Sequence, residues 1–148
     1  MPSSLTQPRQ RARLAVALIS VVTLLLTACS PEQMGALDRI NDARTAHGLP
    51  TVVANPTAMD KAQAWAEQLA ATGSLRHSVL SEAVSPGWVR LAENVGHGST
   101  VDEVQWSFLN SPQHKANMLY AGWNSAGTGV ARAADGTVYV VQVFLQYP

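Results

Sequence analysis

The sequence has a single cysteine and, beyond residue 13, no cluster of basic residues. Cys29 has no partner in the chain, so no internal disulfide can form. The seven basic residues after position 28 stand singly along the sequence, whereas phosphate binding requires Lys and Arg in a stripe or patch. We therefore expect no nucleic-acid partner. The Gly-x-Ser-x-Gly and His-Glu-x-x-His patterns are also absent, which removes two common signatures of hydrolases.

No hydrophobic run is long enough to predict a helix that spans a membrane. The uncharged run at residues 14–26 is shorter than the roughly 20 residues that a spanning helix needs. A basic segment precedes it, with Arg9, Arg11 and Arg13. A basic segment followed by a short apolar run is typical of a secretory signal peptide, so we predict export from the cytoplasm.

The apolar run ends in Leu26-Thr27-Ala28-Cys29, which resembles the end of a bacterial lipoprotein signal. In such signals the cysteine receives a lipid and becomes the first residue after cleavage. We predict a signal peptide at 1–28, a lipidated Cys29 and short tether at 29–33, and one domain at 34–148. The protein would then be anchored on the extracytoplasmic face of a bacterial membrane. The alternative is an ordinary signal that ends near a cysteine by chance.

Residues 29–148 carry a net charge of −3 and have the length of one domain. Cap residues, apolar periodicity and turn signals predict helices over 34–47, from Asn55-Pro56 to Gly73, over 101–109, and from Ser111-Pro112. Strands are expected at 91–95 and in a hairpin whose strands, 127–130 and 138–144, flank Asp135-Gly136.

The second strand of the hairpin is nearly continuously apolar, which indicates that both faces of the sheet are covered. An α+β fold fits this pattern, as a three-layer α/β/α sandwich with a small, mainly antiparallel central sheet.

Three polar residues outside the apolar pattern are candidates for a functional site: His77, Glu93 and His114. Two imidazoles and a carboxylate could bind a divalent metal such as zinc or exchange a proton with water. Asn94 is expected to fix the turn around Glu93. His97, between Gly96 and Gly98, is a further candidate ligand.

The alternative is that the two histidines are partly buried and hold loops together, and that Glu93 accepts backbone N–H bonds. His47, in the last turn of the first helix, has an ordinary structural role near the negative end of the helix dipole. Among the tryptophans, Trp65 and Trp106 lie at helical-face positions and are predicted to pack, whereas Trp88 and Trp123 are predicted at the rim.

Six segments in order across residues 35–147 resemble the CAP superfamily, also called the SCP or cysteine-rich secretory, antigen 5 and pathogenesis-related-1 family. They are the helix Leu37 to Arg44 leading to Gly48-Leu49, Ala64-Trp65-Ala66, the isolated His77, Ala92-Glu93-Asn94-Val95, Trp106 with Ser111-Pro112-Gln113-His114 and Asn117-Met118-Leu119, and the closing strands Gly127 to Val130 and Tyr139 to Phe144.

The resemblance implies an α/β/α sandwich with a cleft lined by two histidines and acidic residues, and in several members the histidines bind zinc or another divalent ion. His77 and His114 match the pair, and Glu93 matches the first acid. The family's second acid has no counterpart in Ser107-Phe108-Leu109, because Glu103 precedes Trp106 and serves a helix cap. A metal held by two imidazoles alone would bind weakly and exchange.

Three functions remain open from the sequence. The first is a binding module whose cleft holds a small ligand, lipid, cell-wall (peptidoglycan) fragment or envelope protein. The second is a metal- or His/Glu-assisted hydrolase with His77, Glu93 and His114 as its catalytic residues. The third is a regulator of a cell-wall enzyme that acts through its surface.

Overall fold

A computed structural model describes residues 30–148 of the chain. The predicted signal peptide and the predicted lipidation site, Cys29, lie outside the described residues. The elements follow in the order α1 (Pro31–Ala46), β1 (Val53–Ala54), α2 (Pro56–Thr72), β2 (Arg90–Gly98), α3 (Val101–Asn110), α4 (Pro112–Met118), β3 (Ser125–Arg132) and β4 (Val138–Gln146).

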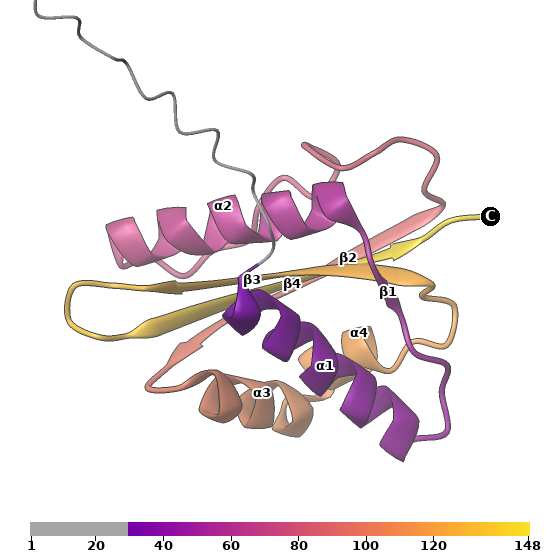
Figure 1. Cartoon of the computed structure of the whole chain (residues 1–148), viewed down its shortest axis with the longest axis horizontal. Coiled ribbons are helices and arrows are strands. Elements are labelled where there is room, and N and C mark those ends of the chain that lie inside the picture. Colours follow the sequence, from indigo (N-terminus) through magenta and orange to yellow (C-terminus); the bar gives the residue numbers. More distant parts are fainter. Residues whose placement is uncertain (1–29) are drawn as a thin grey trace, which may run out of the picture.

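The four strands form one mixed sheet in the order β1-β3-β4-β2. The short β1 is parallel to β3, and the other two pairings are antiparallel. In Figure 1, α2 covers one face of the sheet, and α1, α3 and α4 cover the other. The predicted three-layer sandwich with a mainly antiparallel sheet is therefore confirmed. Within residues 30–148, no helix combines the length and apolar character that a membrane span requires.

Two of the three predicted caps form their side-chain bond, whereas Ser111 begins α4 without one. The side chain of Asn55 accepts the N–H of Ala58 at the start of α2, and Thr100 accepts the N–H of Glu103 at the start of α3. One boundary differs from the prediction, because α1 begins at Pro31 and residues 30–33 are not a tether. Ser30 and Gln33 cap each other reciprocally, which satisfies N–H groups that the helix start leaves free.

The central strand β4 separates two apolar cores, and its residues 138–145 are all buried. Alternate side chains point to opposite faces of a strand. Val141, Val143 and Leu145 pack under α2, whereas Val140 and Phe144 pack on the side of α1, α3 and α4. β2 is longer than the predicted 91–95 because it pairs with β4 along its whole length, from Arg90 to Gly98.

Helix α2 lies in direct backbone contact with β3. A Cβ atom on Gly127 would overlap the backbone of Ala58, and one on Gly129 would overlap the carbonyl of Ala62. Two small residues one helical turn apart therefore match two glycines that point to the same face of the strand. This close approach fixes the helix on the sheet.

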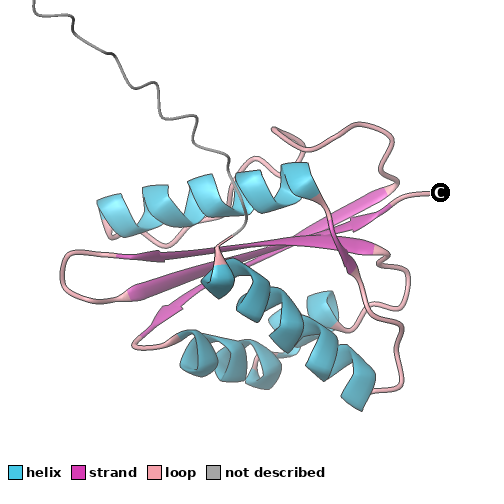
Figure 2. Cartoon of the chain, viewed as in Figure 1, coloured by secondary structure: helices cyan, strands magenta, loops and turns pink. Residues whose placement is uncertain are grey.

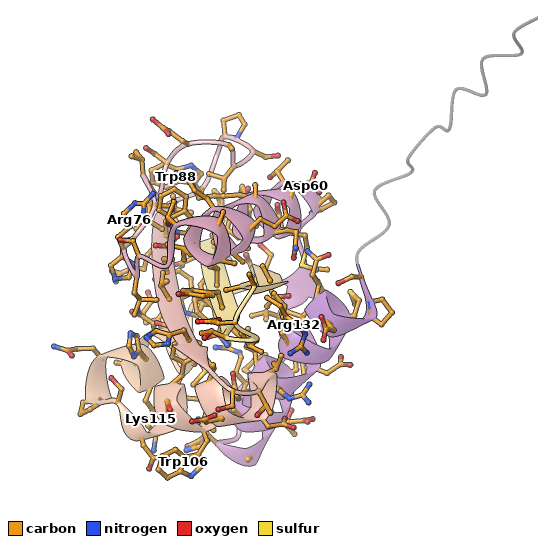
Figure 3. The ribbon with its side chains drawn as sticks, turned by 90° about the vertical axis from the view of Figure 1, so that its left-hand side faces the viewer. Asp60, Arg76, Trp88, Trp106, Lys115 and Arg132 are labelled. Carbon is orange, nitrogen blue, oxygen red and sulfur yellow. The ribbon has the colours of Figure 1, made fainter. Side chains whose placement is uncertain are left out.

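The structure corrects the prediction for two of the tryptophans. Trp123 was expected at the rim but is only 4% exposed, stacked on Phe144. Trp106 was expected to pack but is 66% exposed on α3, and Figure 3 shows it at the outer side of that helix. Val104 and Phe108 cover the buried face of α3, as their spacing predicts, and Trp106 lies two residues from each of them, on the opposite side of the helix.

We predict that Gly129→Ala lowers the free energy of unfolding by about 3 kcal/mol or more, because overpacking against backbone cannot be relieved by a rotamer change. Urea denaturation measures this loss. Gly35→Ala is the matched control, since its Cβ would meet only the flexible end of Arg39. In a helix, Ala is more favourable than Gly by up to about 1 kcal/mol, so this variant should not lose stability. Equal stability of the two variants would contradict the proposed contact.

Candidate functional site

The loop at residues 73–89 runs back along α2 before it enters β2, as Figure 2 shows. Three α2 side chains, spaced four residues apart, bind it in turn. Trp65 Nε1 donates to the carbonyl of Arg76 at 3.0 Å, Lys61 Nζ donates to the carbonyl of Val79 at 2.8 Å, and Thr57 Oγ1 accepts the N–H of Ser85 at 2.9 Å. These contacts place His77 beside the edge strand β2.

Glu93 extends from β2 toward this loop, and its side chain is 1% exposed. The carboxylate accepts three hydrogen bonds, from His77 Nδ1 at 2.7 Å, Ser78 N at 2.9 Å and Ser78 Oγ at 2.6 Å. A buried carboxylate without such donors would carry a large desolvation cost. The bonds to His77 and Ser78 therefore use the carboxylate of Glu93 to hold the loop in place.

The bond to Glu93 also sets the tautomer of His77. An ionised carboxylate can only accept, so the proton lies on Nδ1 and the neutral ring leaves Nε2 as an acceptor. The side chain of His77 is 63% exposed. A carboxylate that orients a histidine and raises the basicity of its other nitrogen is the usual outer partner of a metal-binding or proton-accepting imidazole.

The next residue of β2, Asn94, points to the opposite face of the sheet and is fully buried. Its Nδ2 donates to the carbonyl of His114 at 3.0 Å and to Gln142 Oε1 at 3.1 Å, and its Oδ1 accepts from Asn117 at 2.9 Å. Asn94 was expected to fix a turn around Glu93. It lies within a strand and instead holds α4, the helix that carries His114.

The second histidine, His114, is half-buried and packs edge-to-face on Phe108, with ring centroids 5.0 Å apart. Burial lowers the pKa of His114, and a positive charge on a protonated His77 would lower it further. His114 is therefore a neutral imidazole at neutral pH, the form that binds metals.

His97 lies apart from this pair. It is exposed, and its ring lies tilted against that of Tyr139 with centroids 5.6 Å apart. With Asp135, it lines a hollow at the turn of the β3-β4 hairpin. Glu103 is also occupied elsewhere, because its carboxylate accepts the N–H of Ser99 next to the α3 cap. Among residues 30–148, no group of three or more His, Cys, Asp or Glu side chains is arranged to hold a metal.

The sequence did not reveal several residues that position the site. Ser78 supplies two of the three bonds to Glu93. Gln142 and Gln105 extend the contact of Asn94 into the core, with Gln142 Nε2 donating to Gln105 Oε1 at 2.8 Å. The sequence did contain one indication of this network: Gln142 interrupts the apolar run of β4, and a polar residue in a buried strand requires a hydrogen-bond partner.

We predict that the stability of the protein falls as the pH is lowered from about 7 to 5, in part through His114. Its pKa is lower in the folded state, so the unfolded state binds more protons below about 6.5, and each such group contributes up to about 1.4 kcal/mol per pH unit. His114→Gln should reduce this slope in urea denaturation. His97→Gln is the control, and equal slopes in the two variants would exclude a contribution from His114.

Comparison with known proteins gives consistent results. The family model of the cysteine-rich secretory protein family, CAP, matches residues 37–144. Among solved structures, an outer surface protein from Borrelia burgdorferi superposes with a TM-score of 0.68 at 19% identity, over 80% of this chain and 95% of that one. No protein of the curated set matches.

An extracellular protein from Bacillus anthracis that contains an SCP domain aligns with a TM-score of 0.63 at 19% identity, over 80% of this chain and 44% of that one. NaASP2, solved with Zn²⁺, aligns with a TM-score of 0.62 at 14% identity, over 80% of this chain and 81% of that one. The family match spans most of the described fold, from α1 to β4. The chain therefore belongs to the cysteine-rich secretory protein (CAP) family, although it has a single cysteine.

Proposed function

We propose that this protein is an extracytoplasmic, membrane-anchored binding module. Its site around His77 and His114 holds a small ligand, a lipid, a cell-wall fragment or an envelope protein. One observation carries this proposal: the Glu93 carboxylate accepts three bonds from His77 and Ser78. A buried acid with its oxygens occupied is a support for the loop, and a hydrolase of this type would need a carboxylate free to exchange a proton with water.

The donor set fits a resident zinc poorly. Structural zinc sites use four protein ligands and catalytic sites use three, whereas the described residues offer no such cluster. Two imidazoles remain, the exposed His77 with Nε2 free and the half-buried His114. We infer that a divalent metal binds here weakly and exchanges. The zinc affinity of this protein can be compared with that of NaASP2, which was solved with Zn²⁺.

We predict that the purified protein binds zinc only at about micromolar concentration or above, which corresponds to roughly 8 kcal/mol or less of binding free energy. Calorimetric titration measures this affinity. Binding should be lost in His77→Ala and in His114→Ala, because each removes one of two ligands, and His97→Ala should bind as the wild type does.

Retained zinc binding in both single variants would contradict the two-histidine site.

A hydrolase is the second candidate, because a histidine oriented by an acid, with its other nitrogen exposed, is also the arrangement of a general base. The two functions are distinguished by incubating the protein with peptidoglycan. Turnover that disappears in His77→Ala and His114→Ala would replace the binding proposal, whereas turnover that survives in the double variant would come from a contaminant.

The proposed anchor is a lipid on Cys29, and the start of the domain supports a close attachment. Ser30 already caps α1, and the helix begins at Pro31, so the proposed lipid would be attached one residue before the folded domain. Each buried methylene of a lipid chain contributes about 0.8 kcal/mol to membrane binding.

We predict that Cys29→Ala moves the protein from the membrane fraction to the soluble fraction of a bacterial host that processes lipoproteins. Mass spectrometry of the wild type should show the added lipid. Ser30→Ala is the matched control, because it removes a helix cap worth about 1 kcal/mol without removing the acceptor thiol. A wild-type mass without an added lipid, or the same lipid mass on Cys29→Ala, would contradict a lipid anchor.

A further inference from the structure

A hollow of about 310 Å³ lies between α2 and the loop that follows it. Residues of α2 form one wall, and the loop with His77 forms the other; they are Lys61, Ala64, Trp65, Gln68, His77, Ser78, Val79, Glu82 and Ala83. Its volume is at the lower end of the range for small-molecule sites, which begins at about 300 Å³.

Lys61 is the unusual residue in this hollow, because it is only 8% exposed and forms no ion pair among residues 30–148. Its ammonium group carries three donors, and the described structure gives it one hydrogen-bond acceptor, the carbonyl of Val79 at 2.8 Å. Burial lowers the pKa of Lys61, and the charges of Glu93 and Glu82 partly oppose this effect. A buried cation with unused donors carries a desolvation cost that an anionic partner would offset.

The remaining walls define the kind of anion. Ala64, Val79 and Ala83 are apolar, and Trp65 contributes its ring while its Nε1 is bonded to the carbonyl of Arg76. One lysine and one glutamate, Glu82, line the hollow, and the charge of Glu93 also acts on Lys61. These carboxylates would repel a phosphate dianion more strongly than a ligand with a single negative charge. An apolar body with one charged end matches this surface.

We propose that the hollow binds a small organic carboxylate, with the carboxylate on Lys61 and the apolar part against Trp65 and Val79. The inference rests on the proposed binding function, because His77 lines the same hollow. It requires no metal. The carboxylate can belong to a free aliphatic acid or to the C-terminus of a short peptide, which share this chemistry.

The two sources are separated by two pairs of probes: octanoate with octanamide, and N-acetyl-Ala-Ala with its C-terminal amide. Each is titrated into the protein by NMR, in the presence of a chelator. We expect at least one acid to bind about tenfold or more tightly than its amide, because a bond to a charged partner contributes more than a neutral one. Binding of octanoate alone identifies the free acid, and binding of the peptide alone identifies the C-terminus.

Lys61→Met tests the role of the charge. The variant keeps an apolar stem of similar length and should abolish the preference for acid over amide. A lysine that only holds the loop would give a different result, since its loss would weaken acid and amide equally. Lys115→Met is the matched control, because Lys61 and Lys115 are the only lysines of the chain, and it should keep the preference.

One further variant completes the test. Glu82→Gln should strengthen acid binding by removing a repulsive charge. Equal binding of acid and amide to the wild type, or no binding of either acid, would overturn the carboxylate proposal. Because the chelator removes metals, that outcome is independent of the zinc titration, and each proposal can fail alone.

Discussion

The site depends on a chain of buried amide hydrogen bonds that ties the edge strand β2 to the core. Asn94 bonds to Gln142, and Gln142 bonds to Gln105 on α3. All three side chains are buried, so each missing bond would leave an unsatisfied polar group at a cost of about 1–3 kcal/mol. An edge strand has a partner on one side only, and this amide chain supplies the second constraint that holds β2 in place.

Two adjacent residues of β2, Glu93 and Asn94, hold the two histidines on opposite faces of the sheet. Adjacent residues of a strand point to opposite faces, so Glu93 reaches the loop with His77 while Asn94 reaches α4 and the carbonyl of His114. The two imidazoles come from different layers of the sandwich, yet two consecutive residues fix both. Their surroundings differ accordingly: His77 is oriented by an acid and faces solvent, whereas His114 packs on Phe108 and is partly desolvated.

The sequence predicted those parts of the fold that depend on local signals. Asn55-Pro56, Thr100 with Glu103, and Asp135-Gly136 act within a few residues, and the corresponding elements begin or turn there. The order of motifs was sufficient to identify the family. The sequence allowed that Glu93 accepts backbone N–H bonds, and one of its three bonds is of this kind. That the donor is Ser78 was not predictable, because it depends on how a long loop returns along α2. The exchanged roles of Trp106 and Trp123 have the same origin, since burial of an aromatic ring is decided by which neighbours already fill the core.

The two ways in which α2 is bound have a consequence for divergence within this fold. Its contact with β3 is backbone against backbone at Gly127 and Gly129, so substitutions there are excluded by volume. Its contact with the loop at 73–89 uses separate side chains, each bonded to one backbone group. Insertions and replacements in that loop leave the sheet unaffected, provided that they spare His77 and Ser78, which bond to Glu93 of β2. Descendants of this sequence can therefore acquire new ligands by altering the loop while the scaffold beneath it stays unchanged.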